Sequence, residues 1–319
     1  MKWKLETENK MSSFQEAYAK TLEKLIQNDD RVMVLEADLM KSSGTSSVFE
    51  NYPDNCVNFG ISEANMISAA GGMSKGELIP YAHSFAPFIT RRTLDQIYMS
   101  IAYSNNNLHI YASDAGIWAQ RNGGTHTSYE DIAIMNAIPE CRIFDPCDPV
   151  QFSWVLKNYH EEKGLYYSRA GRKAKVQHIY TEDSEFEVGK GCVLRRGTMR
   201  KAIIATGMMV HEALSAADNL QTKGIDVSVI DLFSIKPYDK ELLQTVIKTN
   251  DVIIVAENHS HIGGLGSIVA YEIAKSQYNP CYKHIAVKDS FGEIGSLEYL
   301  RNKFKLNASD IENAIMDNK

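Results

Sequence analysis

The chain has 319 residues, of which 44% are apolar and 23% charged, with a formal net charge of −6, so we expect a folded, water-soluble protein of two domains. The acidic balance and scattered basic residues exclude a nucleic-acid-binding class, and no apolar run reaches the roughly 18 residues of a membrane span. The first ten residues lack a signal-peptide core and the five cysteines form no C-x-x-C pair, so we expect a cytoplasmic protein without disulfides or zinc.

The first half of the chain alternates helical and strand patterns. Residues 12–27 predict an amphipathic helix with one apolar face, formed by Phe14, Tyr18, Leu22, Leu25 and Ile26. Short apolar runs then predict strands at residues 31–37, 78–85, 107–114, 141–146 and 164–170. This alternation is typical of parallel sheets covered by helices.

A polar, acidic stretch at residues 180–191 interrupts this pattern, and we place a domain boundary near residue 185. Beyond it, strands are predicted at residues 201–207, 225–232, 251–257 and 283–287, with helices between them. We therefore predict an α/β protein of two domains, each a mostly parallel sheet flanked by helices. The predicted parts are an N-terminal tail (1–11), a first domain (12–180), a linker (181–190) and a second domain (191–319).

A carboxylate stands at the predicted start of a helix in the stretch VNFGISEANM, residues 57–66. Gly60 follows a short apolar strand, Ser62 suits the N-cap position, and Glu63 falls in the first helical turn. An interaction with the helix dipole would account for such a glutamate. The alternative is a buried acid that holds a proton for a bound group, since burial raises the pKa of a carboxyl group.

Two further motifs bring aromatic and imidazole groups. HSFAPFITRRTLDQ, residues 83–96, has Phe85 and Phe88 three residues apart, which in isolation indicates core packing. NGGTHTSYEDIAIM, residues 122–135, places His126 directly after two glycines and a threonine. The glycine-rich segment 259–267 lacks the G-x-G-x-x-G spacing and does not favour a nucleotide site.

Together the motifs at Glu63, Phe85 and His126 resemble the thiamine diphosphate enzymes of the transketolase family. The resemblance covers residues from about 12 to 310 and corresponds to the pyrimidine-binding and C-terminal domains of a full-length transketolase. It implies that Glu63 is the proton partner of the cofactor's aminopyrimidine ring, that Phe88 stacks on this ring and that Phe85 forms a wall of its pocket. It also implies that His126 donates to the ketose carbonyl oxygen as negative charge develops there.

Other site residues follow from the resemblance alone. Asp38 matches a family aspartate close to the cofactor, and Arg92 falls in the cofactor-binding segment. Ser42 matches a serine near the acceptor's phosphate, and Arg169 matches a phosphate-binding arginine. The predicted substrate-binding set also includes Ser113, Asn122 and His126.

Three positions depart from the family pattern. Asn122 replaces an aspartate that reads a sugar hydroxyl, Ser113 replaces a histidine, and Gln15 stands where an arginine grips the terminal phosphate. The loss of cationic donors predicts a substrate with another anionic end, such as a sulfonate, or a modified or nucleotide-linked sugar. Arg121 and Arg172 are the candidates to replace the lost cations.

The family binds the cofactor's diphosphate through a metal ion held by a G-D-G motif, and this sequence contains no G-D-G. The metal, Mg²⁺ or Ca²⁺, is therefore expected on a partner chain that carries the N-terminal half, in an (αβ)₂ heterotetramer. This predicts one subunit of a split transketolase, which moves a two-carbon ketol unit from a ketose to an aldehyde. The alternatives are the β subunit of a 2-oxo acid dehydrogenase, an enzyme similar to 1-deoxyxylulose-5-phosphate synthase, and a catalytically silent regulatory paralogue.

Overall fold

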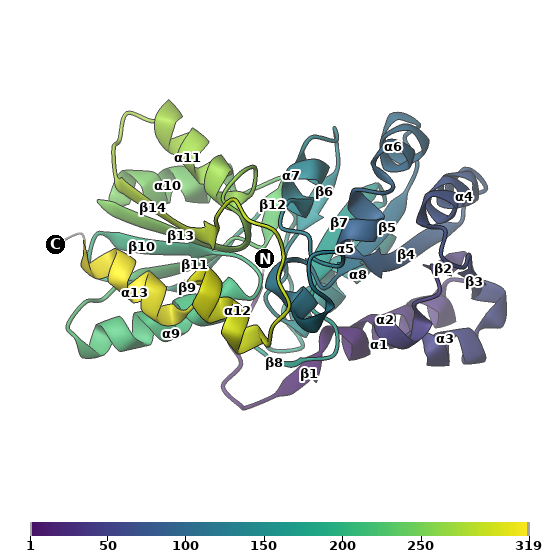
Figure 1. Cartoon of the computed structure of the whole chain (residues 1–319), viewed down its shortest axis with the longest axis horizontal. Coiled ribbons are helices and arrows are strands. Elements are labelled where there is room, and N and C mark those ends of the chain that lie inside the picture. The colour runs from purple at the N-terminus through teal and green to yellow at the C-terminus, as the bar shows by residue number, and fades with distance from the viewer. Residues whose placement is uncertain (1, 318–319) are drawn as a thin grey trace.

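The computed structural model describes residues 2–317, which form two α/β lobes side by side (Figure 1). A seven-stranded sheet of order β12-β6-β7-β5-β4-β2-β3 is the centre of the first lobe, and a five-stranded sheet of order β14-β13-β10-β11-β9 is the centre of the second. The predicted fold class, two α/β domains, is confirmed. Residue 1 of the predicted tail and residues 318–319 of the predicted second domain lie outside the described residues.

The first lobe is built mainly from residues 11–177. Its strands are β1 (Met11–Ser13), β2 (Val32–Glu36), β3 (Cys56–Asn58), β4 (Ile79–Phe85), β5 (Leu108–Ser113), β6 (Arg142–Phe144), β7 (Leu165–Ala170) and β8 (Lys175–Gln177). Its helices are α1 (Phe14–Asn28), α2 (Met40–Ser43), α3 (Ser46–Asn51), α4 (Glu63–Lys75), α5 (Ala86–Thr90), α6 (Leu94–Gln96), α7 (Asp131–Asn136) and α8 (Pro149–Glu162). Shorter or irregular helical turns are η1 (Pro53–Asn55), η2 (Ile97–Tyr103) and η3 (Gly116–Asn122).

The second lobe follows the linker. Its strands are β9 (Cys192–Arg195), β10 (Lys201–Ala205), β11 (Ser228–Asp231), β13 (Val252–Ser260) and β14 (Cys281–Val287). Its helices are α9 (Met209–Thr222), α10 (Lys240–Thr249), α11 (Leu265–Lys275), α12 (Leu297–Phe304) and α13 (Ala308–Met316). One strand from this part of the chain, β12 (Ser234–Lys236), crosses over and pairs antiparallel with β6, so the two lobes share the edge of the first sheet.

The first helix illustrates how the sequence sets the fold. Ser13 accepts a hydrogen bond from the backbone N–H of Glu16, whose carboxylate in turn accepts from the N–H of Ser13, so both ends of a capping box are satisfied. All five residues of the predicted apolar face are buried. Helix α1 packs against α8 on one face of the first sheet.

The N-terminal segment and the linker pair with each other, although we predicted them as a separate tail and a separate linker. The N–H of Lys2 donates to the carbonyl of Glu185 at 2.9 Å, and the N–H of Glu6 donates to the carbonyl of Ile179 at 2.8 Å. Trp3 also packs edge-on against Tyr180. The segment therefore runs as an extended chain along the linker.

The glycine-rich turn before α11 is filled from within the chain. The carboxylate of Glu257 accepts the N–H groups of Leu265 and Gly266 at 2.9 and 2.8 Å, and it also lies 2.8 Å from the Nε2 atom of His284. These N–H groups are the ones that a phosphate would use at a helix N-terminus. The turn is therefore structural, in agreement with the sequence analysis.

No helix within residues 2–317 combines the length and the apolar character needed to cross a bilayer.

Candidate active site

The carboxyl ends of the parallel strands in the first sheet meet at one edge. The neighbours β3, β2, β4, β5 and β7 all run parallel, so the loops that follow them lie together. In parallel α/β sheets this edge is where ligands bind. Asp38 follows β2, Glu63 follows β3, Phe85 ends β4, and the loop after β5 carries Asn122 and His126.

Glu63 is buried, with 1% of its surface exposed, although it starts a helix. Its Oε1 atom accepts the hydroxyl of Ser84 at 3.3 Å, and its Oε2 atom accepts Nη1 of Arg92 at 2.6 Å. Ser62 occupies the predicted N-cap position but makes no capping bond, since its hydroxyl donates to the carbonyl of Phe59. The sequence therefore predicted the helix start correctly and the cap chemistry wrongly.

Phe85, Phe88 and His126 form one aromatic cluster. The ring centroids of Phe85 and Phe88 are 5.9 Å apart, and the imidazole of His126 lies 5.5 Å from the first and 5.0 Å from the second, each pair edge to face. The Nδ1 atom of His126 shares a hydrogen bond of 2.8 Å with the hydroxyl of Thr125, so the ring is held by its own loop. The structure thus brings together three residues that come from two separate motifs of the sequence.

Arg92 joins this cluster to Glu63. Its guanidinium carbon lies 4.4 Å from the centroid of the Phe88 ring while its Nη1 atom bonds to Glu63. A flat group with N–H donors therefore fits between a carboxylate and an aromatic face at this place. The aminopyrimidine of thiamine diphosphate is such a group, so the residues present fit the pyrimidine half of the cofactor.

The loop that carries His126, residues 114–128, is held by the second lobe; we call it the histidine loop. The side chain of Asn258 on β13 accepts the N–H of Ile117 at 2.9 Å and donates to the carbonyl of Ala115 at 3.2 Å. The coil between β14 and α12, which passes the junction of the lobes in Figure 1, packs Gly292 against Thr127. The second domain therefore positions a loop of the first.

Asp38 and Ser42 lie in the loop and short helix after β2. Asp38 is exposed and has a φ of 61°, in the left-handed region that most residues avoid. The side-chain oxygen of Asn58 accepts the N–H groups of Asp38 and Gly60, both at 3.0 Å, so it ties the loops after β2 and β3 together. Ser42 is half-buried on α2, and Asn122 is exposed at the end of η3.

Arg169, which we predicted to bind the substrate, is held inside the protein. Arg169 is 1% exposed, and its guanidinium donates to the carboxylates of Asp131 and Asp145 and to the carbonyl of Asn258. Every nitrogen of the group has a partner inside the protein. Four of its five N–H donors are therefore bonded inside the protein, and the bond to the carbonyl of Asn258 links β7 of the first lobe to β13 of the second.

Ser113, which we also predicted to contact substrate, is withdrawn from the surface. It is fully buried, and its hydroxyl lies 2.9 Å from Nε2 of His83, whose Nδ1 lies 2.9 Å from the carboxylate of Glu36. The hydroxyl of Thr45 donates to the other oxygen of Glu36. This buried chain of polar groups, which the sequence analysis missed, joins the carboxyl-terminal parts of β2, β4 and β5. Its only signal in the sequence is a charged residue, Glu36, inside an apolar run.

A second arginine of the same segment lies closer to the aromatic cluster. The guanidinium carbon of Arg172 is 4.7 Å from the centroid of the Phe85 ring, and its Nε atom donates to Asp114 at 2.5 Å. Burial raises the pKa of Asp114 to about 6, and the charge of Arg172 opposes this rise.

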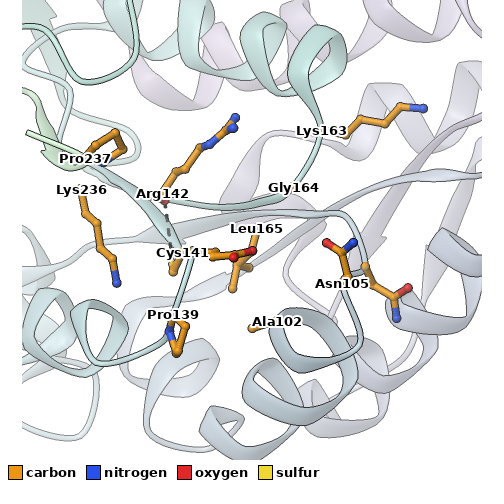
Figure 2. Close-up of a pocket in the computed structure, with 12 residues that line it drawn as sticks. Ala102, Asn105, Pro139, Cys141, Arg142, Lys163, Gly164, Leu165, Lys236 and Pro237 are labelled. Carbon is orange, nitrogen blue, oxygen red and sulfur yellow. Dashed lines mark hydrogen bonds between the residues drawn. The ribbon is translucent and has the colours of Figure 1, made fainter.

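A hollow of about 470 Å³ lies at the opposite edge of the first sheet, where β6 and β7 begin (Figure 2). Cys141, Arg142, Leu165 and Lys236 contribute to its lining. The ammonium group of Lys236 donates to two backbone carbonyls, and Arg142 donates to the backbone carbonyl and the carboxylate of Glu162. This hollow is separate from the residues around Glu63.

Comparison with known proteins agrees with this geometry. Residues 10–172 match the transketolase pyrimidine-binding domain, and residues 189–311 match the transketolase C-terminal domain. A 6-deoxy-6-sulfo-D-fructose transketolase subunit of Clostridium sp. (strain MSTE9) is 39% identical over 300 residues, which cover 94% of this chain and 92% of that one. A putative transketolase C-terminal section of Methanocaldococcus jannaschii is 35% identical, covering 94% of each chain.

Solved structures give the same result. A split-gene transketolase, described as an inactive β4 tetramer, superposes with a TM-score of 0.86 at 36% identity, covering 96% of this chain and 97% of that one. The transketolase of Campylobacter jejuni shares the fold with a TM-score of 0.81 at 18% identity, and the match covers 98% of this chain but 48% of that one. The chain therefore belongs to the transketolase family, of which it contains the pyrimidine-binding and C-terminal domains.

Proposed function

We propose that the chain is one subunit of a thiamine diphosphate-dependent transketolase, which transfers a two-carbon ketol unit from a ketose to an aldehyde. The observation that carries this proposal is the meeting of a buried carboxyl group, Glu63, with the Phe85–Phe88–His126 cluster at the carboxyl edge of a parallel sheet. Thiamine diphosphate supplies the nucleophilic carbon that accepts the ketol unit. The residues of this chain hold and protonate the pyrimidine half of that cofactor.

Each residue of the site has a defined part in the proposal. Glu63 exchanges a proton with the ring nitrogen of the aminopyrimidine, which a buried carboxyl group next to an aromatic wall is placed to do. Phe88 offers its face for stacking, Phe85 closes the pocket, and the imidazole of His126 donates to the substrate oxygen on which negative charge develops. Asp38 lies at the neighbouring strand end and contributes to the cofactor pocket.

Arg92 has to leave the place that we assign to the ring. It occupies both the Oε2 atom of Glu63 and the face of Phe88, and 45% of its side chain is exposed. An exposed, flexible arginine can swing out and then bind the rim of the pocket or the partner chain. We therefore keep Arg92 among the cofactor-binding residues, as a group that moves when the cofactor binds.

The proposal includes a partner subunit that carries the diphosphate-binding half with its G-D-G motif and its metal ion. The support is that the clostridial relative is named a transketolase subunit and that the similar split-gene transketolase structure is described as an inactive β4 tetramer. Two pyrimidine halves and two diphosphate halves then give an (αβ)₂ assembly. The metal, Mg²⁺ or Ca²⁺, takes oxygen ligands from the partner.

For the donor we propose a ketose whose terminus is a sulfonate rather than a phosphate. The clostridial relative is named for 6-deoxy-6-sulfo-D-fructose. The resemblance to transketolases implies that Gln15 and Ser113 stand where the family has an arginine and a histidine. With Arg169 committed to the lobe junction, an ordinary phosphate would meet few donors.

Glu63→Gln tests the proposed function. The amide keeps the size of the side chain but cannot exchange the proton, so turnover by the assembled enzyme should fall by about 100-fold or more. Circular dichroism and subunit assembly should stay unchanged. Turnover within about tenfold of wild type, with cofactor and partner present, would refute the role of Glu63. Glu50→Gln, an exposed glutamate on α3, is the matched control.

A further inference from the structure

The proposed donor ends in an anion, and the chain must supply a cation to bind it. Arg169 is 1% exposed, and Asp131, Asp145 and the carbonyl of Asn258 take four of its five N–H donors, so it is not open to a ligand at the surface. Gln15, at the second family position for an anion-binding arginine, is uncharged. A different basic residue must therefore lie in the same corner.

Arg172 lies in that corner. Its carbonyl accepts the N–H of Gln15 at 3.2 Å, and the side chain of Gln15 donates to the carbonyl of Lys41, the neighbour of Ser42. Its guanidinium bonds to Asp114, the neighbour of Ser113. Of the two substituted positions, Gln15 contacts Arg172 directly, and Ser113 is joined to it through the neighbouring Asp114. This arrangement is expected if the charge of Arg172 replaces the charges lost at positions 15 and 113.

The guanidinium of Arg172 has donors to spare. Its Nε atom donates to Asp114, and its guanidinium carbon lies 4.7 Å from the centroid of the Phe85 ring. That ring in turn lies 5.5 Å from the imidazole of His126. The terminal nitrogens bond to no group within residues 2–317, and 16% of the side chain is exposed. The group is thus held at one edge and open at the other, which suits two parallel hydrogen bonds to an oxyanion.

We propose that Arg172 binds the anionic terminus of the donor ketose and that its pairing with Asp114 selects a terminus with a single negative charge. This inference rests on the proposed function. The Asp114 carboxylate, 6% exposed, offsets most of the arginine's charge. A sulfonate carries one negative charge, which the partly offset charge of Arg172 is enough to bind. A phosphate monoester carries nearly two negative charges at neutral pH, and the second would be repelled by the nearby Asp114 carboxylate.

The experiment compares charged and uncharged donors in the assembled enzyme. We would measure kcat/KM for 6-deoxy-6-sulfofructose, fructose 6-phosphate and uncharged erythrulose with wild type, Arg172→Ala and Asp114→Asn. For Arg172→Ala the sulfonated donor should lose roughly 10- to 100-fold relative to erythrulose, the range of a charge-assisted hydrogen bond. For Asp114→Asn the ratio of phosphate to sulfonate should rise, because the offsetting charge is gone.

Arg196→Ala is the matched control, since Arg196 is an exposed arginine of the second domain with no part in the proposed site, and it should leave the ratio of charged to uncharged donor as it is in wild type. Arg121→Ala is measured beside it, because Arg121 is the other candidate for the anion. An equal loss for all donors in Arg172→Ala would mean that Arg172 only supports Phe85, and the inference would be wrong. A change in the ratio with Arg121→Ala alone would also overturn it. If wild type turns over none of the three ketoses, the proposed function itself fails and this inference fails with it.

Discussion

Replacement of Asn258 by alanine should both destabilise the protein and loosen the histidine loop. The side chain lies on β13 of the second domain, is 2% exposed, and makes two hydrogen bonds to the backbone of Ile117 and Ala115. The alanine variant leaves a buried N–H and a buried carbonyl without partners. Each such loss costs about 1–3 kcal/mol, so we expect the free energy of unfolding to fall by about 3 kcal/mol.

Denaturant unfolding followed by circular dichroism measures the loss, and hydrogen exchange measures the loop. Exchange should speed up more in residues 114–128 than in the strands of the second sheet, because the strands feel only the lower global stability whereas the histidine loop also loses its anchor. Asn302→Ala, on the exposed face of α12, is the control and should change stability by less than about 0.5 kcal/mol. A stability loss below about 1 kcal/mol in Asn258→Ala, or a loss without faster exchange in the loop, would refute the anchoring role.

Two further predictions concern charged groups. Arg92→Ala should tighten the binding of thiamine diphosphate to the chain up to about thirtyfold in calorimetry, because the guanidinium no longer competes for Glu63 and Phe88. Weaker binding would show that Arg92 holds the cofactor directly. Burial raises the pKa of Asp231 to about 7 from an ordinary 3.8, so between these values the folded state binds more protons than the unfolded state and stability falls as pH rises. Asp231→Asn should therefore lessen the loss of unfolding free energy between pH 5 and pH 7, and an unchanged slope would contradict the assigned pKa.

The strands that the sequence predicted are the ones with long apolar runs. β4 and β13 lie inside their sheets with neighbours on both sides, so nearly every residue is buried and the run of apolar residues shows their position. β1, β8 and β12 escaped prediction because each has three residues and forms only when a distant segment pairs with it. No local pattern can encode a pairing whose partner lies more than 80 residues away.

At the site, the residues predicted by motif also lie together, whereas the motifs do not show how two arginines of one segment differ. Arg169 lies within β7, a strand buried along its whole length, while Arg172 comes two residues after its end. The apolar run LYYSRA already indicates that an arginine inside it must be buried and paired. Which carboxylates pair with it could not be predicted, since Asp131 and Asp145 reach it only through the tertiary fold.

The contacts of Arg92 also allow us to calculate how much this residue lowers the affinity of the single chain for thiamine diphosphate. An ion pair with a half-exposed arginine is worth about 0.2–1 kcal/mol, and the contact with the Phe88 ring adds about 0.5–1 kcal/mol. Displacement of Arg92 therefore costs about 1–2 kcal/mol, at most about a thirtyfold reduction in affinity. This cost is small beside the contribution of a diphosphate bound through a metal ion. If the lone chain binds thiamine diphosphate poorly, the main cause must then be the half of the site that we assign to the partner, and removal of Arg92 alone should not restore tight binding.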